Sequence, residues 1–291
     1  MTISCPICNS QNEKQSDSRT IIRIGKFYRK SDSTFVQRFR CQKCLKGFSR
    51  ATLHPCYRQN KRHKNEILRR LLCSGVSQRR AAKILTITRT TVVRKFIFLS
   101  IQAKKILRER NQRAPNCTII EFDDMESFEH TKCKPLAITL AVEHKSRRIL
   151  GFSVSQMKPK STLHALASKK YGPRKDLRYL GRRQLFREIR NLINPCSTIK
   201  SDQNPHYPKD VREFFPRATH KKYKGRRGCI VGQGELKKIG FDPLFSLNHT
   251  CAMFRANVNR LVRKTWCTTK KAHNLAHHLA LYAVYHNENL K

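Results

Sequence analysis

Apolar and polar residues alternate in two short runs near the start of the chain and then change to a helical spacing. The alternating runs, at 20–24 and 34–39, predict the two strands of a small hairpin. Further on, apolar positions recur every three or four residues, which is the period of an amphipathic helix. This spacing predicts three successive helices, at 67–72, 78–85 and 89–96. Gly75 ends the first of them, and Ser77 can cap the second.

From residue 114 onwards, strand-like and helical patterns are mixed. Four apolar runs predict strands, at 117–124, 135–142, 148–154 and 197–201. Helical spacing predicts three helices, at 181–194, 208–215 and 244–264. The polar residues 220–227 indicate a basic loop. This order predicts an α/β domain with a mixed sheet, so we divide the chain into domains at 1–56, 57–113 and 114–291.

The chain is strongly basic, with 62 Lys and Arg against 19 Asp and Glu and a formal net charge of +43 at pH 7. A charge of this size exceeds what solubility requires and indicates a polyanionic partner, with nucleic acid as the first expectation. No apolar run approaches the length of a membrane-spanning helix, and the first residues contain no signal-peptide core. We therefore expect a cytoplasmic, nucleoid-associated protein with no membrane partner.

Two C-x2-C pairs flank the predicted hairpin, Cys5 with Cys8 and Cys41 with Cys44. Four thiolates at this doubled spacing complete the tetrahedral shell of a structural Zn2+ ion. The sequence therefore predicts a zinc ribbon at 1–56. The other cysteines show no such pairing, and we expect them to be small core residues.

Residues 57–113 carry 17 Lys or Arg and only two acids, Glu66 and Glu109. Three helices in this order predict a helix-turn-helix, whose third helix enters the major groove of DNA. The side chains that would lie near phosphates and base edges are Arg89, Thr90, Thr91 and Arg94. A small helical bundle without DNA contacts has similar spacing, but the cationic polar faces favour DNA binding.

Five of the 19 acidic residues fall between positions 121 and 129: Glu121, Asp123, Asp124, Glu126 and Glu129. Asp123 and Asp124 close one predicted strand, and Asp202 follows another. Carboxylates at strand ends are the hard oxygen ligands that Mg2+ or Mn2+ binds. These acids could instead only neutralise neighbouring cations. Because acids are scarce and two lie at matched strand ends, metal binding is favoured.

Three stretches are the most specific: FDDMESF at 122–128, SDQNPHY at 201–207, and an Arg-rich stretch at 255–265. With the order of the predicted elements, they resemble insertion-sequence transposases that use an RNase H-like DDE core. The resemblance covers nearly the whole chain. It implies an RNase H-like mixed sheet with helices, preceded by a zinc ribbon and an all-α helix-turn-helix. It also implies that Asp123 and Asp202 are the first and second metal ligands, with Asp124 as a neighbouring acid.

The third acidic ligand of that family belongs on the long C-terminal helix, where alignment of the Arg-rich stretch places Asn248. An Asn can offer a carbonyl oxygen to a metal but adds no charge. Glu235 is a substitute at a suitable distance from Asp202, although the glycines around it favour a loop. Asp242, nearer the helix start, is a third candidate and also a typical helix cap.

The resemblance implies Mg2+-dependent or Mn2+-dependent phosphodiester cleavage and strand transfer, with double-stranded DNA as element end and target. Arg255 and Arg263 would hold the DNA backbone beside the site, or else form a solvated helix face. A homo-oligomer on DNA is expected because joining two ends requires two active sites. The alternative function is a catalytically inactive, transposase-derived DNA-binding protein, which Asn248 leaves open. An RNA-directed nuclease is less favoured, because a major-groove helix suits B-form DNA.

Overall fold

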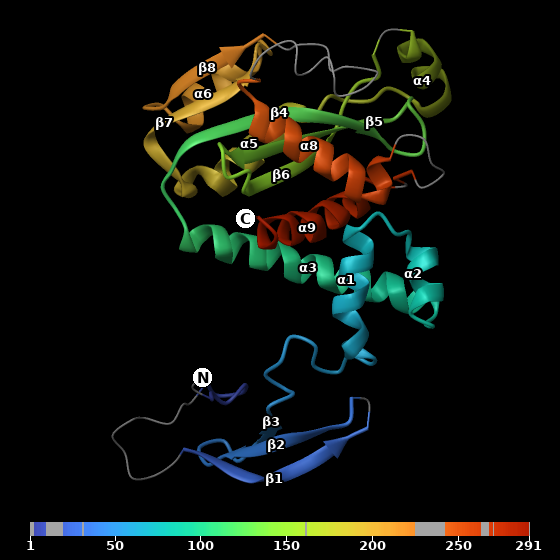
Figure 1. Cartoon of the computed structure of the whole chain (residues 1–291), viewed down its shortest axis with the longest axis vertical. Helices are drawn as coiled ribbons and strands as arrows, with labels where there is room; N and C mark the ends of the chain where they lie inside the picture. The colour runs from blue at the N-terminus through green and yellow to red at the C-terminus, as the bar shows by residue number, and fades with distance from the viewer. Residues whose placement is uncertain are drawn as a thin grey trace. The chain divides into compact units, whose positions relative to one another are not determined.

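The computed structural model describes residues 3–9, 20–30, 32–160, 162–224, 242–262, 268–269 and 271–290. Contacts within the chain divide it into two compact units, Met1–Glu66 and Ile67–Lys291 (Figure 1). The three-part division that the sequence suggests stays a prediction. None of the described helices has both the length and the apolar character needed to cross a membrane.

The first unit contains a three-stranded antiparallel sheet in the order β1-β2-β3. Its strands are β1 (Ile21–Arg29), β2 (Thr34–Cys41) and β3 (Gly47–Ser49). The predicted hairpin is therefore confirmed, and β3 is an addition to it. The core is a small cluster of buried residues, namely Cys5, Ile21, Phe39, Cys41 and Phe48. A core of this size normally needs a metal or another cross-link to stay folded.

Three helices follow the first sheet, and two of them begin with hydroxyl caps. They are α1 (Asn65–Cys73), α2 (Gln78–Ile84) and α3 (Arg89–Arg113), after a short 3-10 turn η1 (Arg62–Lys64). Ser77 Oγ accepts a hydrogen bond from the Arg80 amide at 3.3 Å, which confirms the predicted cap of α2. Thr88 Oγ1 caps α3 by accepting from the Thr91 amide at 3.3 Å.

The third helix is much longer than its sequence pattern predicts. The pattern ends at residue 96, whereas α3 continues to Arg113. Its second half packs along α9 (Ala272–Glu288) and buries Ala103 and Leu107 in the core that it shares with the sheet. Tertiary packing of this kind extends a helix beyond what its own periodicity indicates.

The second unit is built on a five-stranded sheet in the order β6-β5-β4-β7-β8. Strands β4 (Cys117–Phe128), β5 (Pro135–Glu143) and β6 (Ile149–Gln156) form an antiparallel meander. Strands β7 (Ile193–Asp202) and β8 (Thr219–Tyr223) run parallel to β4. This mixed sheet with helices confirms the predicted α/β class.

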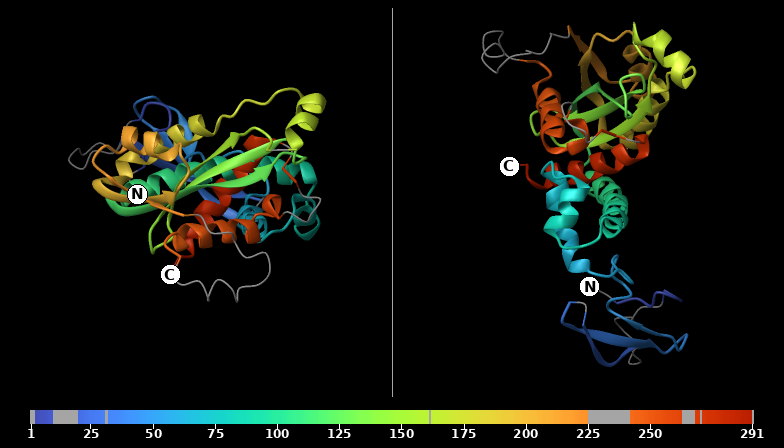
Figure 2. Two further views of the ribbon diagram at one scale, coloured as in Figure 1. Left: turned by 90° about the horizontal axis from the view of Figure 1, so that it is seen from above. Right: turned by 90° about the vertical axis from the view of Figure 1, so that its right-hand side faces the viewer.

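Helices lie on both sides of the sheet (Figure 2), and alternate residues of the strands face two separate cores. Leu136, Ile138 and Leu140 of β5 pack with α3, α9 and α8 (Phe245–Asn257). On the other face, Phe122 and Ala141 pack with α5 (Arg178–Ile189) and α6 (Tyr207–Phe214). The remaining elements are α4 (Leu163–Tyr171) and the 3-10 turns η2 (Arg190–Leu192) and η3 (Asn259–Leu261).

Helix α5 lies unusually close to strand β6 because glycines stand at the contact. A Cβ atom added at Gly181 would lie 1.8 Å from Ser155 Oγ, and one added at Gly151 would lie 2.7 Å from Leu185 Cδ1. A Cβ atom essentially never has a non-bonded contact this short, so neither position admits a side chain without a shift.

Several predicted elements have different bounds in the structure. The helix expected at 181–194 is α5, which ends at Ile189, and β7 already begins at Ile193 rather than at residue 197. Strand β4 does not end at residue 124, because it stays paired with β5 as far as Phe128. The expected basic loop at 220–227 contains strand β8, which is held by backbone pairing with β7. The helix expected at 244–264 ends at Asn257, whose carbonyl accepts a hydrogen bond from the Gly75 amide at 2.8 Å. The Gly75 amide therefore satisfies a carbonyl that the next turn of the helix would otherwise engage.

Candidate functional site

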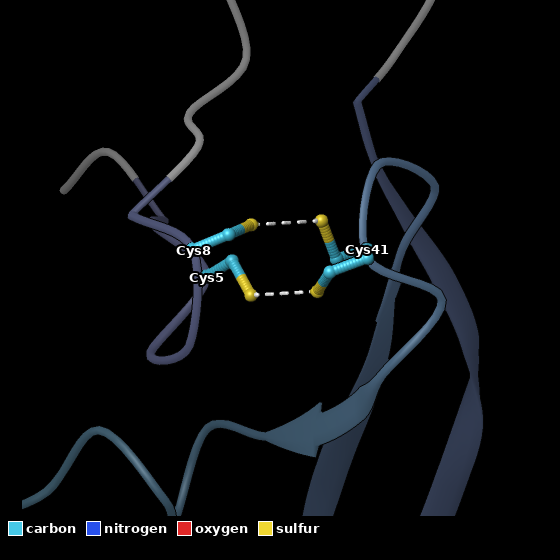
Figure 3. A group of neighbouring side chains, drawn as sticks. Cys5, Cys8 and Cys41 are labelled. Carbon is cyan, nitrogen blue, oxygen red and sulfur yellow. Dashed lines mark hydrogen bonds between the residues drawn. The ribbon is translucent and has the colours of Figure 1, made fainter.

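The four cysteines of the two C-x2-C pairs converge in the first unit (Figure 3). Their Sγ atoms all lie within 4.8 Å of one another, with 3.6 Å between Cys5 and Cys44 and 3.6 Å between Cys8 and Cys41. A tetrahedron of thiolates about 2.3 Å from a central Zn2+ has edges of about 3.8 Å. The four side chains therefore have the spacing of a tetrahedral metal site.

The isolated cysteines are mostly buried, as expected for small core residues. Buried positions are Cys73, Cys117, Cys133 and Cys251. Cys56 is half-buried, and Cys196 is exposed, so the expectation is wrong for Cys196. Cys229 and Cys267 lie outside the described residues.

The sheet brings Asp123 and Asp202 to matching positions on adjacent parallel strands. Glu121 of β4 lies opposite Lys200 of β7, and each Asp stands two residues beyond its member of that pair. Side chains two residues apart share a face of the sheet. Strand β7 ends at Asp202, so the two carboxylates meet where β7 leaves β4.

Burial raises the pKa of Asp123 to about 7, and the nearby Asp202 carboxylate adds to the rise. Two hydrogen bonds oppose it, because Asp123 Oδ1 accepts from the Asp124 amide at 2.7 Å and from the Tyr207 hydroxyl at 3.0 Å. The pKa of Tyr207 is itself raised, by burial and then by the surrounding carboxylates, so its hydroxyl keeps its proton. Two adjacent carboxylates of this kind fit a divalent cation, which would relieve their repulsion.

Asp202 is held in a similar way. Its Oδ1 accepts a hydrogen bond from the Asn204 amide at 3.0 Å, just beyond the end of β7. Within the described residues, Oδ2 of neither Asp123 nor Asp202 has a hydrogen-bond donor. Each carboxylate therefore has one oxygen engaged by the protein and one oxygen without a donor among the described residues.

Asp124 faces the opposite side of the sheet from Asp123 and has structural partners. Its Oδ1 accepts from Thr139 Oγ1 at 2.5 Å, and its Oδ2 lies 3.9 Å from the guanidinium of Arg182. Arg182 is 3% exposed and also binds Asp210 of α6, with 2.6 Å between Nε and Oδ2. Burial raises the pKa of Asp124, although Thr139 and Arg182 lower it. This carboxylate belongs to a buried network under α5, and it also interacts with the Tyr207 hydroxyl and adds to the raised pKa of Asp123.

Glu121 anchors helix α8 to the sheet. Its side chain is fully buried, and its Oε2 accepts a hydrogen bond from the Leu247 amide in the first turn of α8 at 2.8 Å. Its other oxygen binds His144 Nδ1, and Lys200 Nζ lies 3.3 Å from the same ring. A carboxylate at a helix N-terminus satisfies free amides and complements the helix dipole.

The last two acids of the cluster make ion pairs away from the Asp123–Asp202 pair. Glu126 pairs with Lys160. Glu129 lies 3.6 Å from Arg174 and accepts from the Ala272 amide at 2.9 Å, where α9 begins. The acidic cluster therefore combines one candidate metal ligand, Asp123, with four residues that have structural partners.

The three candidates for the third ligand differ in their surroundings. Asn248 is exposed on α8, and its Nδ2 donates to Asp242 Oδ2 at 2.7 Å. Asp242 Oδ1 accepts from the Leu244 amide at 2.9 Å, so this residue organises the turn before α8. Glu235 lies outside the described residues. Among the residues that the structure describes, the four cysteines are the only group of three or more Cys, His, Asp or Glu with ligand spacing.

Helix α8 passes close to the carboxylate pair. The Asp123 carboxylate helps to raise the pKa of Cys251 to about 12, mainly a consequence of burial, while Arg255 lowers it. Cys251 therefore lies near both Asp123 and Arg255, and Arg255 is exposed one helical turn further along α8. Arg263 lies outside the described residues.

The predicted groove-facing residues stand at the start of α3. Arg89, Thr90 and Arg94 are exposed. Thr91 is half-buried, and its hydroxyl lies 2.9 Å from that of Thr88, within the helix cap. The three helices share a buried core with the sheet, which holds the start of α3 in a fixed position within the second unit.

Sequence reasoning missed the residues that orient the carboxylates. Glu121 carried a usable signal, because an acid inside an apolar strand must have a buried partner. Tyr207 and Arg182 carried none, since their roles depend on how α5 and α6 lie against β4.

The fold and the site together define an α/β protein with a mixed five-stranded sheet and a carboxylate pair at the end of β7. No protein-family model and no curated protein matches the chain. Three solved structures to which it is similar are all of Mos1 mariner transposase. The catalytic domain has 11% identity and a TM-score of 0.24, with 66% of this chain and 91% of that chain covered.

The second structure, a pre-cleavage Mos1 transpososome, has 10% identity and a TM-score of 0.21, with 74% of each chain covered. The third, a Mos1 paired end complex with Mn, has 12% identity and a TM-score of 0.23, with 73% of this chain and 74% of that chain covered. At these low scores the similarity adds no argument about function.

Proposed function

We propose that the chain is a DNA transposase that uses Asp123 and Asp202 to bind Mg2+ or Mn2+ for phosphodiester cleavage and strand transfer. The observation that carries the proposal is the matched position of the two carboxylates on adjacent parallel strands, each with one oxygen engaged and one oxygen available. A divalent cation bound there supplies activation of the attacking oxygen and stabilisation of the leaving oxygen.

The chain's own residues would hold and orient the DNA. The net charge of +43 attracts the phosphate backbone, and the exposed Arg255 lies on the helix that passes the carboxylate pair. Arg263 is a further candidate from the sequence. The carboxylates themselves repel DNA, so a bound cation is needed before a phosphate can approach them.

Recognition of the DNA sequence is assigned to the start of α3. Arg89, Thr90, Thr91 and Arg94 are the proposed contacts to phosphates and base edges in the major groove. The exposure of Arg89, Thr90 and Arg94 supports this assignment, whereas the Thr91 hydroxyl is already part of the α3 cap.

Three residues are candidates for the third metal ligand, ranked in the order Asn248, Glu235 and Asp242. Asn248 stands on the helix that Glu121 anchors beside the site, which supports its place. Zn2+ is proposed at Cys5, Cys8, Cys41 and Cys44, where it would hold the first unit together. A homo-oligomer on DNA is proposed because joining two element ends requires two active sites.

The test is Mn2+-dependent nicking of a DNA fragment that carries the gene and its flanks. Asp123→Asn and Asp202→Asn should each abolish defined nicks, because each removes a charge from the cation site. Glu109→Gln is the matched control, since this exposed acid pairs with Lys105 at 3.7 Å and lies on α3, and it should nick as the wild type does. Asn248→Ala and Glu235→Ala then identify the third ligand.

The second candidate is a catalytically inactive DNA-binding protein derived from a transposase. The neutral Asn248, bonded to Asp242, is the observation that favours it. In that case the wild type binds the fragment with a steep salt dependence but produces no nick with Mn2+ or Mg2+. That result would remove the catalytic assignments and leave the DNA-binding ones in place.

A further inference from the structure

Tyr207 is held between two neighbours, Phe122 and Arg182. It is the first residue of α6, and its side chain is fully buried. Its ring lies 4.8 Å from the ring of Phe122 on β4, and the Arg182 guanidinium lies 4.9 Å from the ring centroid on another side. Asp210 of α6 holds that guanidinium in turn. The ring has no room to turn, so the position of its hydroxyl is set by the fold.

The hydroxyl completes the hydrogen bonding of one oxygen of Asp123. Oδ1 accepts from the Tyr207 hydroxyl at 3.0 Å and from the Asp124 amide at 2.7 Å. A carboxylate oxygen has two lone pairs, and two donors at these distances occupy both. Oδ2 has no donor among the described residues, so one oxygen of Asp123 is left for other partners, and Asp202 lies close enough to raise the pKa of the same carboxyl.

We propose that Tyr207 is a positioning residue that makes Asp123 a one-oxygen ligand, binding the divalent cation through Oδ2 alone. This inference rests on the proposed function, because it concerns the same cation site. Mg2+ and Mn2+ favour compact octahedral sites with single carboxylate oxygens, whereas Ca2+ accepts two-oxygen carboxylates and higher coordination numbers. Tyr207 therefore selects for the smaller cations.

The prediction concerns the affinities of the whole 291-residue chain for two metals, Mn2+ and Ca2+. Tyr207→Phe retains the ring contacts but frees one lone pair of Oδ1, so Asp123 can turn and bind through both oxygens. Mn2+ affinity, measured by electron paramagnetic resonance of free Mn2+, should fall by about tenfold or more, as is usual when a partner of a metal ligand is removed. Ca2+ affinity, measured by competition with Mn2+, should fall less, so the preference for Mn2+ over Ca2+ decreases.

Tyr179→Phe is the matched control, because Tyr179 is 53% exposed on α5 and its loss should change neither affinity. Only folded molecules bind at the site, so the ratio of the two affinities stays measurable even if Tyr207→Phe lowers stability. A merely structural role for Tyr207 predicts an equal loss for both metals, and that result would overturn the inference. So would unchanged Mn2+ binding in Tyr207→Phe.

Failure of the proposed function has a different signature. The wild-type chain should bind Mn2+, and Asp123→Asn and Asp202→Asn should each abolish that binding. If Mn2+ binds equally with and without these carboxylates, the proposed cation site is wrong, and the proposed role of Tyr207 is wrong as well. If both carboxylates are needed but the Mn2+/Ca2+ ratio is the same in wild type and Tyr207→Phe, only the inference about Tyr207 is wrong.

Discussion

At the scale of single residues, five acids that are neighbours in sequence have different partners in space. Because β4 is a strand, Asp123 and Asp124 face opposite sides of the sheet. Asp123 lies near Asp202, whereas Asp124 interacts with Arg182 and Thr139. A cluster of like charges in sequence therefore does not mark a cluster in space, and the period of the strand decides which acid can bind a metal.

The raised pKa of Asp123 predicts a pH-dependent loss of stability in the metal-free protein. The folded-state pKa, about 7, lies above the ordinary value of 3.8. The contribution of the neutral carboxyl is therefore fully present below about pH 4 and is lost as pH rises to 7 and above. Asp123→Asn should raise the melting temperature at pH 8 by a few degrees, at about 2–4 °C per kcal/mol for a domain of this size. The gain should shrink towards zero at pH 4.

The control for this measurement is Asp176→Asn, because the pKa of Asp176 is lowered whereas that of Asp123 is raised. Arg178 lowers the pKa of Asp176, so the ionised carboxyl stabilises the fold at neutral pH and the benefit disappears as pH falls. This variant should be slightly less stable than wild type at pH 8 and should converge with it in acid. A higher melting temperature for Asp123→Asn that does not vary with pH would contradict the assignment.

At the scale of elements, the contact between α5 and β6 depends on the absence of a side chain at Gly181. Gly181→Ala places a methyl group against Ser155 and should destabilise the protein by about 1–3 kcal/mol. Adding Ser155→Ala removes the closest atom, Ser155 Oγ, and should recover part of that loss. Urea unfolding of the two single variants and the double variant measures the coupling. Additive effects would mean that α5 does not meet β6 at this point.

The anchor of α8 gives a second prediction about an element. Glu121→Gln keeps the size of the side chain but cannot accept hydrogen bonds from both Leu247 and His144 with two oxygens. The loss should be about 1–3 kcal/mol, with faster amide exchange in the first turn of α8. Glu109→Gln, at an exposed position, should stay within about 0.5 kcal/mol of wild type. Unchanged exchange at Leu247 in Glu121→Gln would show that the carboxylate does not hold the helix.

The elements that the sequence predicted well are those whose own side chains specify them. β5 is apolar along its length, and Asp202 could be placed at a strand end because β7 has its own alternating pattern. β8 could not be predicted, since its side chains are mostly polar and its pairing comes from the backbone of β7. The second half of α3 and the early end of α8 depend on α9 and Gly75, which are distant in sequence.

The sequence predicted which residue types form the candidate site but not how their side chains are oriented. Asp202 could be chosen because it stands at the end of a strand that the sequence predicts. Asp123 could be chosen for the same reason, but β4 continues to Phe128, so Asp123 lies inside its strand and meets Asp202 because β7 ends beside it. The hydrogen bond between Tyr207 and Asp123 spans 84 positions and requires the placement of a helix that no local pattern reveals. Orientation of a ligand is a tertiary property, whereas the residue type is a sequence property.

At the scale of the whole molecule, the two units should respond differently to removal of metal. The core of the first unit is a small cluster that includes the cysteines, whereas the second has a large core on each face of its sheet. A strong chelator should release Zn2+ and expose residues 20–66 to proteases, while the second unit keeps its unfolding transition. Cys41→Ser should have the same effect, and Cys196→Ser should have none. A shared transition in chelator would contradict this independence.

One helix of the second unit extends from the proposed recognition residues to the sheet. Arg89 is exposed in the first turn of α3, and Asn111 in the last turn donates to the Leu150 carbonyl at 2.9 Å. The 25 residues of this helix span about 38 Å without a joint. If the chain is the proposed transposase, such a rod sets the distance between the sequence that is bound and the bond that is cut. Moving the bound sequence by one base pair should move the nick by one base pair, whatever bases then occupy the cut position.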